Sequence, residues 1–107
     1  MFARVLKMRL KVDKIAEATR IFRETVIPLC RKQRGFKGGY YMSDPKTGES
    51  LALTLWEREE DMLETESSHF FQEQVARFIP FYAKPPIRTA FEVEVMVREE
   101  PKGVKKP

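Results

Sequence analysis

Apolar and polar residues alternate near both ends of the chain. Residues 2–10 read FARVLKMRL, where the apolar residues Leu6, Met8 and Leu10 are separated by basic ones. Residues 87–97 read IRTAFEVEVMV, where apolar residues and glutamates alternate in the second half. A period of two places one kind of residue on each face of a β-strand. We therefore predict a strand at each segment, and the second has the clearer pattern.

A spacing of three and four residues predicts a helix over residues 14–34. Pro28 has no N–H and should kink this helix, and Gly35 lies where a left-handed helix stop is needed. The predicted apolar face contains Ile15, Ala18, Phe22, Val26, Leu29 and Cys30. We expect this face to pack against the sheet.

Two further strands are predicted to form a hairpin. Residues 39–43 (GYYMS) and 50–57 (SLALTLWE) flank the sequence DPKTG at 44–48, and its Asp, Pro and Gly favour a tight turn. The neighbouring Tyr40 and Tyr41 should point to opposite faces of their strand. One tyrosine should therefore meet the helices or a pocket, and the other should meet a partner sheet.

The second helical region is predicted to contain two helices. Residues 58–66 form a short helix with acidic residues at its start, and Ser67 or Ser68 can cap the helix that follows. Pro80 should disturb the end of that second helix. The Lys-Pro-Pro sequence at 84–86 is interpreted as a linker to the last strand.

These elements follow the β-α-β-β-α-β order of the ferredoxin-like α+β fold. Its four-stranded antiparallel sheet carries both helical regions on one face. The two middle strands have apolar or aromatic residues at both parities, including Leu53, Leu55 and Trp56. We therefore expect the second face to be covered as well. A second copy of the same sheet is the simplest cover, which would make a dimeric α+β barrel.

Four stretches of the sequence resemble the antibiotic biosynthesis monooxygenase (ABM) group of dimeric α+β barrel proteins. They are VIPLCRKQRGFKGGYYMSD (26–44), LALTLWEREEDM (51–62), SSHFF (67–71) and FEVEV (91–95). The resemblance implies a homodimer with a pocket between sheet and helices in each subunit. It also implies oxidation of aromatic, polyketide-like substrates to quinones without a metal or a flavin.

A haem-degrading branch of the same group relies on an asparagine in the first strand and on a tryptophan and a histidine in the second helical region. The matching places in this chain fall near Met8, Thr65 and Val75, and the chain has no asparagine. Haem degradation is therefore disfavoured, and we expect no cofactor.

The length of 107 residues suits one domain, which we assign to residues 1–98, followed by a basic tail at 99–107. The net charge is +4, and three of the lysines lie in this tail. Residues 1–100 therefore carry 17 basic and 16 acidic groups. This balance is too small for a nucleic-acid-binding face. RGFKGGYY (34–41) mimics an RNA-recognition motif, but it leads into the second strand and that motif belongs on the third.

The sequence also argues against a membrane segment and a metal site. No apolar run approaches the roughly 18 residues of a membrane span, and the N-terminus lacks the apolar region of a signal peptide. We therefore expect a cytoplasmic protein that does not contact a membrane. Cys30 is the only cysteine, and the acidic run at 57–66 reads as a solvated face.

His69 and Trp56 are the only histidine and the only tryptophan of the chain. His69 alone titrates near neutral pH, so it is the catalytic candidate for moving protons or holding a substrate oxygen. We expect Trp56, together with Phe22, Val26 and Phe71, to line an apolar substrate pocket. The alternative is that Trp56 is a core residue and that His69 faces solvent.

Two functions remain open from the sequence. The first is a cofactor-independent, monooxygenase-like enzyme that oxidises a small aromatic or quinol substrate. The second is a non-catalytic homodimeric module that binds a small apolar ligand. A cavity of about 300 Å³ or more with His69 directed into it would favour the enzyme, and a closed pocket with His69 in solvent would favour the module.

Overall fold

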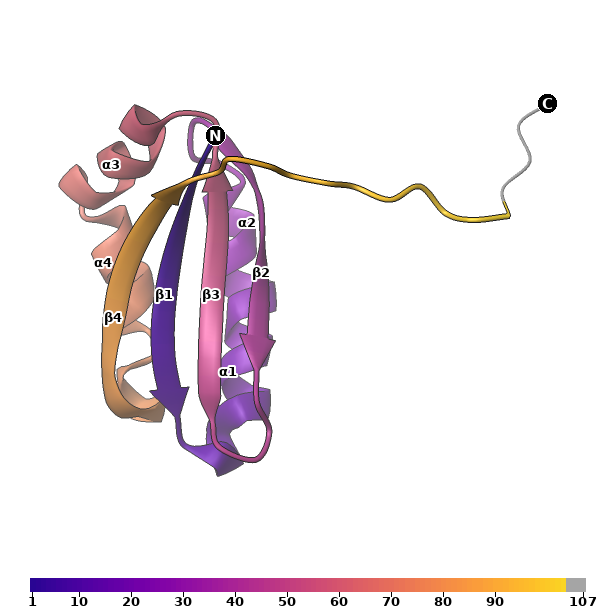
Figure 1. The fold of residues 1–107 in the computed structure, drawn as a ribbon. Helices are drawn as coiled ribbons and strands as arrows, with labels where there is room; N and C mark the ends of the chain where they lie inside the picture. Colours follow the sequence, from indigo (N-terminus) through magenta and orange to yellow (C-terminus); the bar gives the residue numbers. More distant parts are fainter. Residues whose placement is uncertain (104–107) are drawn as a thin grey trace.

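A four-stranded antiparallel sheet forms the centre of the computed structural model, which describes residues 1–103 (Figure 1). Its strands are β1 (Phe2–Leu10), β2 (Phe36–Ser43), β3 (Glu49–Trp56) and β4 (Tyr82–Glu92), in the order β2-β3-β1-β4. The helices cover one face of this sheet (Figure 1). This arrangement confirms the predicted ferredoxin-like α+β fold.

The helical elements lie in two groups between the strands. The first group connects β1 to β2, and the second connects β3 to β4. In chain order they are a 3-10 turn (Val12–Lys14), α1 (Ile15–Ile21), a π-helical turn (Phe22–Val26), α2 (Ile27–Cys30), α3 (Glu59–Ser67), α4 (Phe70–Ala76) and a 3-10 turn (Ile79–Phe81).

The first helical region is more irregular than the pattern predicted. Its distortion is the π-helical turn Phe22–Val26, and the helix ends at Cys30 instead of continuing to residue 34. Pro28 lies two residues after this turn and has no N–H for the carbonyl of Glu24, which explains the local loss of regular α-helical bonding. The expected role of Gly35 is confirmed, since it has a left-handed φ of 81°.

The start of α4 differs from the predicted serine cap. The residue before this helix is His69, which has a left-handed φ of 69°, and no side chain caps the helix. The hydroxyl of Ser68 accepts only a long bond of 3.4 Å from the Phe70 N–H. Histidine is one of the few residue types besides glycine that adopt this conformation with some frequency.

The last strand is confirmed, but its predicted bounds were wrong. Strand β4 spans Tyr82–Glu92 and therefore includes the Lys-Pro-Pro sequence that was interpreted as a linker. Pro85 and Pro86 are tolerated because β4 is an edge strand that pairs only with β1, with register shifts near these prolines. Val95, predicted to lie in the strand, follows its end and is 78% exposed. Lys105 and Lys106 of the predicted tail lie outside the described residues.

The register divides the side chains of the sheet between two faces. Arg4 of β1 pairs with Thr54 and Ala90, and Leu6 pairs with Ala52, so these side chains point toward the helices. The fully buried side chains with the largest volumes are Leu10, Trp56 and Met62. The core therefore lies between the sheet and the helices.

The opposite face of the sheet is apolar and open in the single chain. Its exposed large apolar side chains come from β2, β3 and β4 and are Tyr40, Met42, Leu51, Ile87 and Phe91. The predicted split of the tyrosine pair is confirmed, because Tyr41 is partly buried on the helix side. In the described part of the chain, no helix has the length and apolar character needed to cross a membrane.

Candidate functional site

A small, partly open cavity of about 50 Å³ lies between the sheet and the helices. Most of its wall is apolar, and both the sheet and the helices contribute to it. Strand β1 contributes Leu6 and Met8, and the first helical region contributes Phe22, Val26 and Cys30. The remaining wall residues are Arg4, Tyr41, Ala52, Thr54, Phe70, Phe71, Gln74, Val75 and Phe78.

The structure brings three of the five predicted site residues to this cavity. Phe22 and Val26 begin and end the π-helical turn, and Phe71 comes from α4. A π-helical turn is a feature often found at functional sites. The predicted pocket between sheet and helices therefore exists, although its volume is well below about 300 Å³.

Trp56 is completely buried and does not line the cavity. Its indole N–H donates a hydrogen bond of 3.0 Å to the Thr54 hydroxyl, and its ring packs edge-to-face on Phe36 with centroids 5.5 Å apart. These contacts match the alternative expectation that Trp56 is a core residue.

His69 is exposed and is not among the residues that line the cavity. The left-handed backbone at this position turns the chain from α3 into α4 and leaves the imidazole at the surface of the subunit. Catalysis by His69 is thus not supported by its position in the single chain, and it stays a prediction.

Arg4 is the one charged residue in the cavity wall of the described chain. Its side chain is only 4% exposed. Its Nη1 donates to the Thr65 hydroxyl at 2.8 Å and to the Met62 carbonyl at 3.3 Å, both on α3. The guanidinium carbon lies 3.9 Å from the ring centre of Phe71, a distance suited to cation–π attraction. Burial lowers the pKa of Arg4 and Glu66 opposes this shift, but an arginine stays protonated in proteins.

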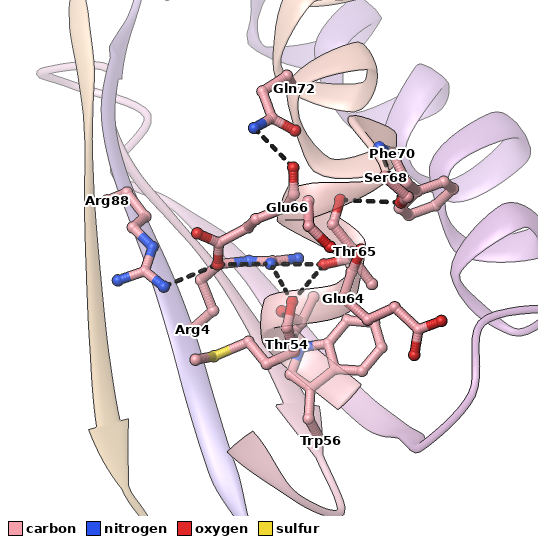
Figure 2. A network of polar contacts seen from close by, with 12 residues as sticks. Arg4, Thr54, Trp56, Glu64, Thr65, Glu66, Ser68, Phe70, Gln72 and Arg88 are labelled. Carbon is pink, nitrogen blue, oxygen red and sulfur yellow. Dashed lines mark hydrogen bonds and ion pairs between the residues drawn. The ribbon is translucent and has the colours of Figure 1, made fainter. Parts of the chain in front are cut away.

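Glu66 of α3 joins Arg4 to a second arginine at the rim of the sheet. Figure 2 shows Arg4 and Arg88 approaching the Glu66 carboxylate from β1 and β4. The Glu66 Oε2 accepts from Arg88 Nη2 at 2.7 Å and from Arg4 Nη1 at 3.1 Å. Partial burial acts to raise the pKa of Glu66, but the hydrogen bonds from Arg88 and Arg4 outweigh it and the pKa is lowered.

Replacing Glu66 with glutamine should make the protein less dependent on pH. The lowered pKa means that the Glu66 carboxylate stabilises the fold at neutral pH, and this contribution disappears as the pH falls below about 4. We expect Glu66→Gln to unfold about 1–3 kcal/mol more easily at pH 7. The difference should shrink toward pH 3 in urea titrations. A constant difference across this range would contradict the ion-pair account.

Tyr41 lines the cavity, and its hydroxyl is buried without a partner in the described residues. Its ring stacks on Phe22, with centroids 4.5 Å apart. Burial raises the pKa of Tyr41 to about 12, and the nearby Ser43 side chain lowers it by a smaller amount. The hydroxyl is therefore a neutral donor at physiological pH, and buried donors normally have a partner.

Cys30 also faces the cavity, and its thiol is not set up as a nucleophile. Burial raises its pKa to about 11, and Arg4 offsets this only in part. The thiol is thus neutral at physiological pH and behaves as a small apolar side chain. Within the described residues, no group of three or more His, Cys, Asp or Glu side chains could hold a metal ion.

Arg4 and Tyr41 were not recognised as site residues from the sequence. A signal for Arg4 is nevertheless present, because Arg4 has the same parity in its strand as Leu6, Met8 and Leu10. A charged residue on the apolar face of a strand must be buried with partners or contact a ligand. The missing partner of Tyr41 depends on packing between β2 and the helices, which no local pattern encodes.

Among known proteins, this chain is similar only to solved structures, and the similarity is one of fold. No protein-family model matches the chain, and no curated protein matches its sequence. A mutant of SnoaB, a cofactor-independent oxygenase from Streptomyces nogalater, superposes with a TM-score of 0.71 at 13% identity, covering 92% of this chain and 97% of that one. The ActVA-Orf6 monooxygenase of Streptomyces coelicolor, solved with nanaomycin D, gives 0.69 at 13% identity, covering 92% of each chain.

A third solved structure, named antibiotic biosynthesis monooxygenase, gives a TM-score of 0.68 at 13% identity and covers 87% of this chain and 98% of that one. Identities this low establish the fold and leave substrate and activity open. The predicted resemblance is therefore confirmed at the level of architecture: the chain has the ferredoxin-like α+β fold of the antibiotic biosynthesis monooxygenases.

Proposed function

We propose that this chain is a cofactor-independent, monooxygenase-like enzyme that oxidises a small aromatic or quinol substrate. The observation that carries this proposal is the apolar cavity, whose wall contains the buried cation of Arg4 and three further polar residues, Tyr41, Thr54 and Gln74. Apolar pockets with a few convergent polar groups are the usual form of small-molecule sites. The likeness in fold to proteins named as oxygenases adds support by analogy.

The proposed reaction for a naphthol balances without a further reductant. The ring C–H and the phenolic O–H give up two hydrogens, which leave with one atom of dioxygen as water. The other oxygen atom becomes the second carbonyl of a quinone. The substrate itself supplies all electrons, so the protein needs to bind the ring, exclude water and hold the reacting oxygens in place.

In this proposal the walls formed by Phe22, Val26 and Phe71 hold the aromatic ring. The cavity is smaller than such a ring, so substrate entry requires Phe22 and Phe71, which are only partly buried, to move outward. Trp56 supports the wall from the core without touching the substrate. His69 would take part in proton transfer only if the helix start at residue 69 moves toward the cavity.

The second candidate is a non-catalytic homodimeric module that binds a small apolar ligand. Two observations favour it: the cavity holds about 50 Å³, and His69 is exposed on the surface of the subunit. In this case the cavity would bind without turnover.

The two candidates are separated by incubating the protein with a panel of hydroxy-anthrones and naphthols under oxygen. Formation of quinone is followed by absorbance for the parent and for His69→Ala. Turnover by the parent supports the enzyme, and binding without turnover supports the module. Equal turnover by both proteins would remove His69 from the mechanism.

The open apolar face of the sheet supports a homodimer as part of the same proposal. Its exposed side chains come from three strands, which is unusual for a face in water. The chain after Glu92 leaves the body in an extended form, and Figure 1 shows it reaching away from the sheet. Its exposed Val95, Met96 and Val97 provide further apolar surface for a second copy. The cytoplasmic location expected from the sequence stays a prediction.

The dimer predicts a mass of about twice 12.6 kDa in light scattering. Ile87→Arg should yield monomers, because Ile87 lies on the open face and is 60% exposed. Ile79→Arg is the matched control, since Ile79 is 66% exposed but belongs to the helical region. A monomeric parent, or loss of the dimer in both variants, would contradict this interface.

A further inference from the structure

Arg4, at the polar end of the cavity, belongs to an ion-pair cluster that carries one positive charge in excess. Two guanidinium groups, Arg4 and Arg88, share the single carboxylate of Glu66. Within the described chain, no second carboxylate forms an ion pair with either arginine. Arg88 lies outside the cavity wall and its side chain is 35% exposed, so water solvates part of its charge, whereas the buried Arg4 depends on the protein or a ligand for compensation. The arrangement is therefore suited to accept a negative charge from a ligand.

Arg4 also has donors that the protein does not use. A guanidinium carries five N–H groups, and all hydrogen bonds of Arg4 within the described residues start from Nη1. The N–H groups of Nε and Nη2 remain without an acceptor there. Arg4 lines the cavity, so these donors form the polar edge available to a ligand.

The surroundings fix the position of this guanidinium. Nη1 is held on α3, and the rings of Phe71 and Trp56 lie 3.9 and 5.5 Å from the guanidinium carbon. A cation held in this way loses little further side-chain entropy when it binds an anion. An arginine edge with two parallel N–H donors matches a carboxylate or phenolate oxygen better than a neutral group.

We propose that the cavity binds a small aromatic anion, whose ionised phenolate or carboxylate oxygen accepts hydrogen bonds from Nε and Nη2 of Arg4. The ring of the ligand would lie among the apolar walls, which include Phe22 and Phe71. This assignment deepens the proposed function, on which it rests for the oxidation step. The binding of the anion itself can be tested separately.

The site selects the ionised form of a substrate. Arg4 is the one charged residue of the described cavity wall, so no negative wall group repels the anion. Glu66 belongs to α3 and is not part of the cavity wall, and its negative charge is paired with both Arg4 and Arg88. An ionised phenol is also the electron-rich form, which gives up electrons to dioxygen more readily than the neutral phenol. One residue would thus bind the substrate and favour its reactive state.

The test compares benzoate with benzamide, which has a similar shape and no charge, by calorimetric titration of the intact protein. We expect benzoate to bind at least about tenfold more tightly, as a charge-assisted bidentate contact predicts. Arg4→Met should remove this preference, and Arg4→Lys should retain part of it. Thermal unfolding of each variant shows whether it is folded. Equal affinity for both ligands in the parent, or no binding of benzoate, would overturn the proposal even if Arg4→Met does not fold.

A second readout uses 4-nitrophenol, whose ionised form absorbs visible light. The parent should raise the ionised fraction of the bound compound at a fixed pH near neutrality, and Arg4→Met should abolish this rise. An unchanged ionised fraction would overturn the claim that Arg4 selects the ionised form of a phenol. Because benzoate is not oxidised, Arg4-dependent binding without turnover of naphthols would reject the enzyme and keep the anion site. Turnover without a preference for anions would reject the anion site alone.

Discussion

Replacing Trp56 with alanine will lower the free energy of unfolding by about 3–5 kcal/mol. The indole is completely buried, so its removal leaves a void that neighbouring side chains cannot fill. It also removes the ring contact with Phe36 and the hydrogen bond to the Thr54 hydroxyl. Chemical denaturation followed by circular dichroism measures this loss.

Trp56→Phe is the matched variant for this prediction. It keeps an aromatic ring at the position and loses the indole N–H, so we expect a loss of only about 1–2 kcal/mol. A Trp56→Ala protein as stable as the parent would contradict the assignment of Trp56 to the core.

Replacing Ala52 with valine will close the cavity and reduce ligand binding by at least about tenfold. Ala52 lies on the helix side of β3 and lines the cavity, so two added methyl groups enter a space of only about 50 Å³. Valine favours strands, and filling a void does not destabilise a fold as overpacking does. We therefore expect near-parent stability together with loss of benzoate binding and of turnover.

Ala83→Val provides the control for this change. Ala83 is exposed on β4 and does not line the cavity, so the same chemical change should leave ligand binding and turnover intact. Full binding by Ala52→Val would show that ligands bind elsewhere on the protein.

Most of the fold could be predicted from local patterns. The period of two predicted β1 over residues 2–10, and the structure has the same bounds. The predicted end of the last strand was wrong because alternation continues through residues 93–97, whereas pairing with β1 ends at Glu92. Pairing depends on the partner strand, and Pro85 and Pro86 are compatible with it only because β4 lies at the edge.

Only part of the candidate site could be predicted from the sequence. Helical spacing identified Phe22 and Val26 as residues that face the sheet, and the structure places both at the cavity. The chemical character of His69 made it a candidate, but its exposure depends on a left-handed residue between two helices. Arg4 shows that the parity of a residue in its strand predicts burial better than its chemical type does.

The measurement that tests the account most directly is oxygen consumption by the purified protein with naphthols, without added metal or flavin. We expect uptake of one dioxygen per quinone formed, with a marked loss of rate in Ala52→Val and none in Ala83→Val. Absence of oxygen uptake by the parent, together with failure of benzoate to bind, would contradict the claim that this cavity is a functional site.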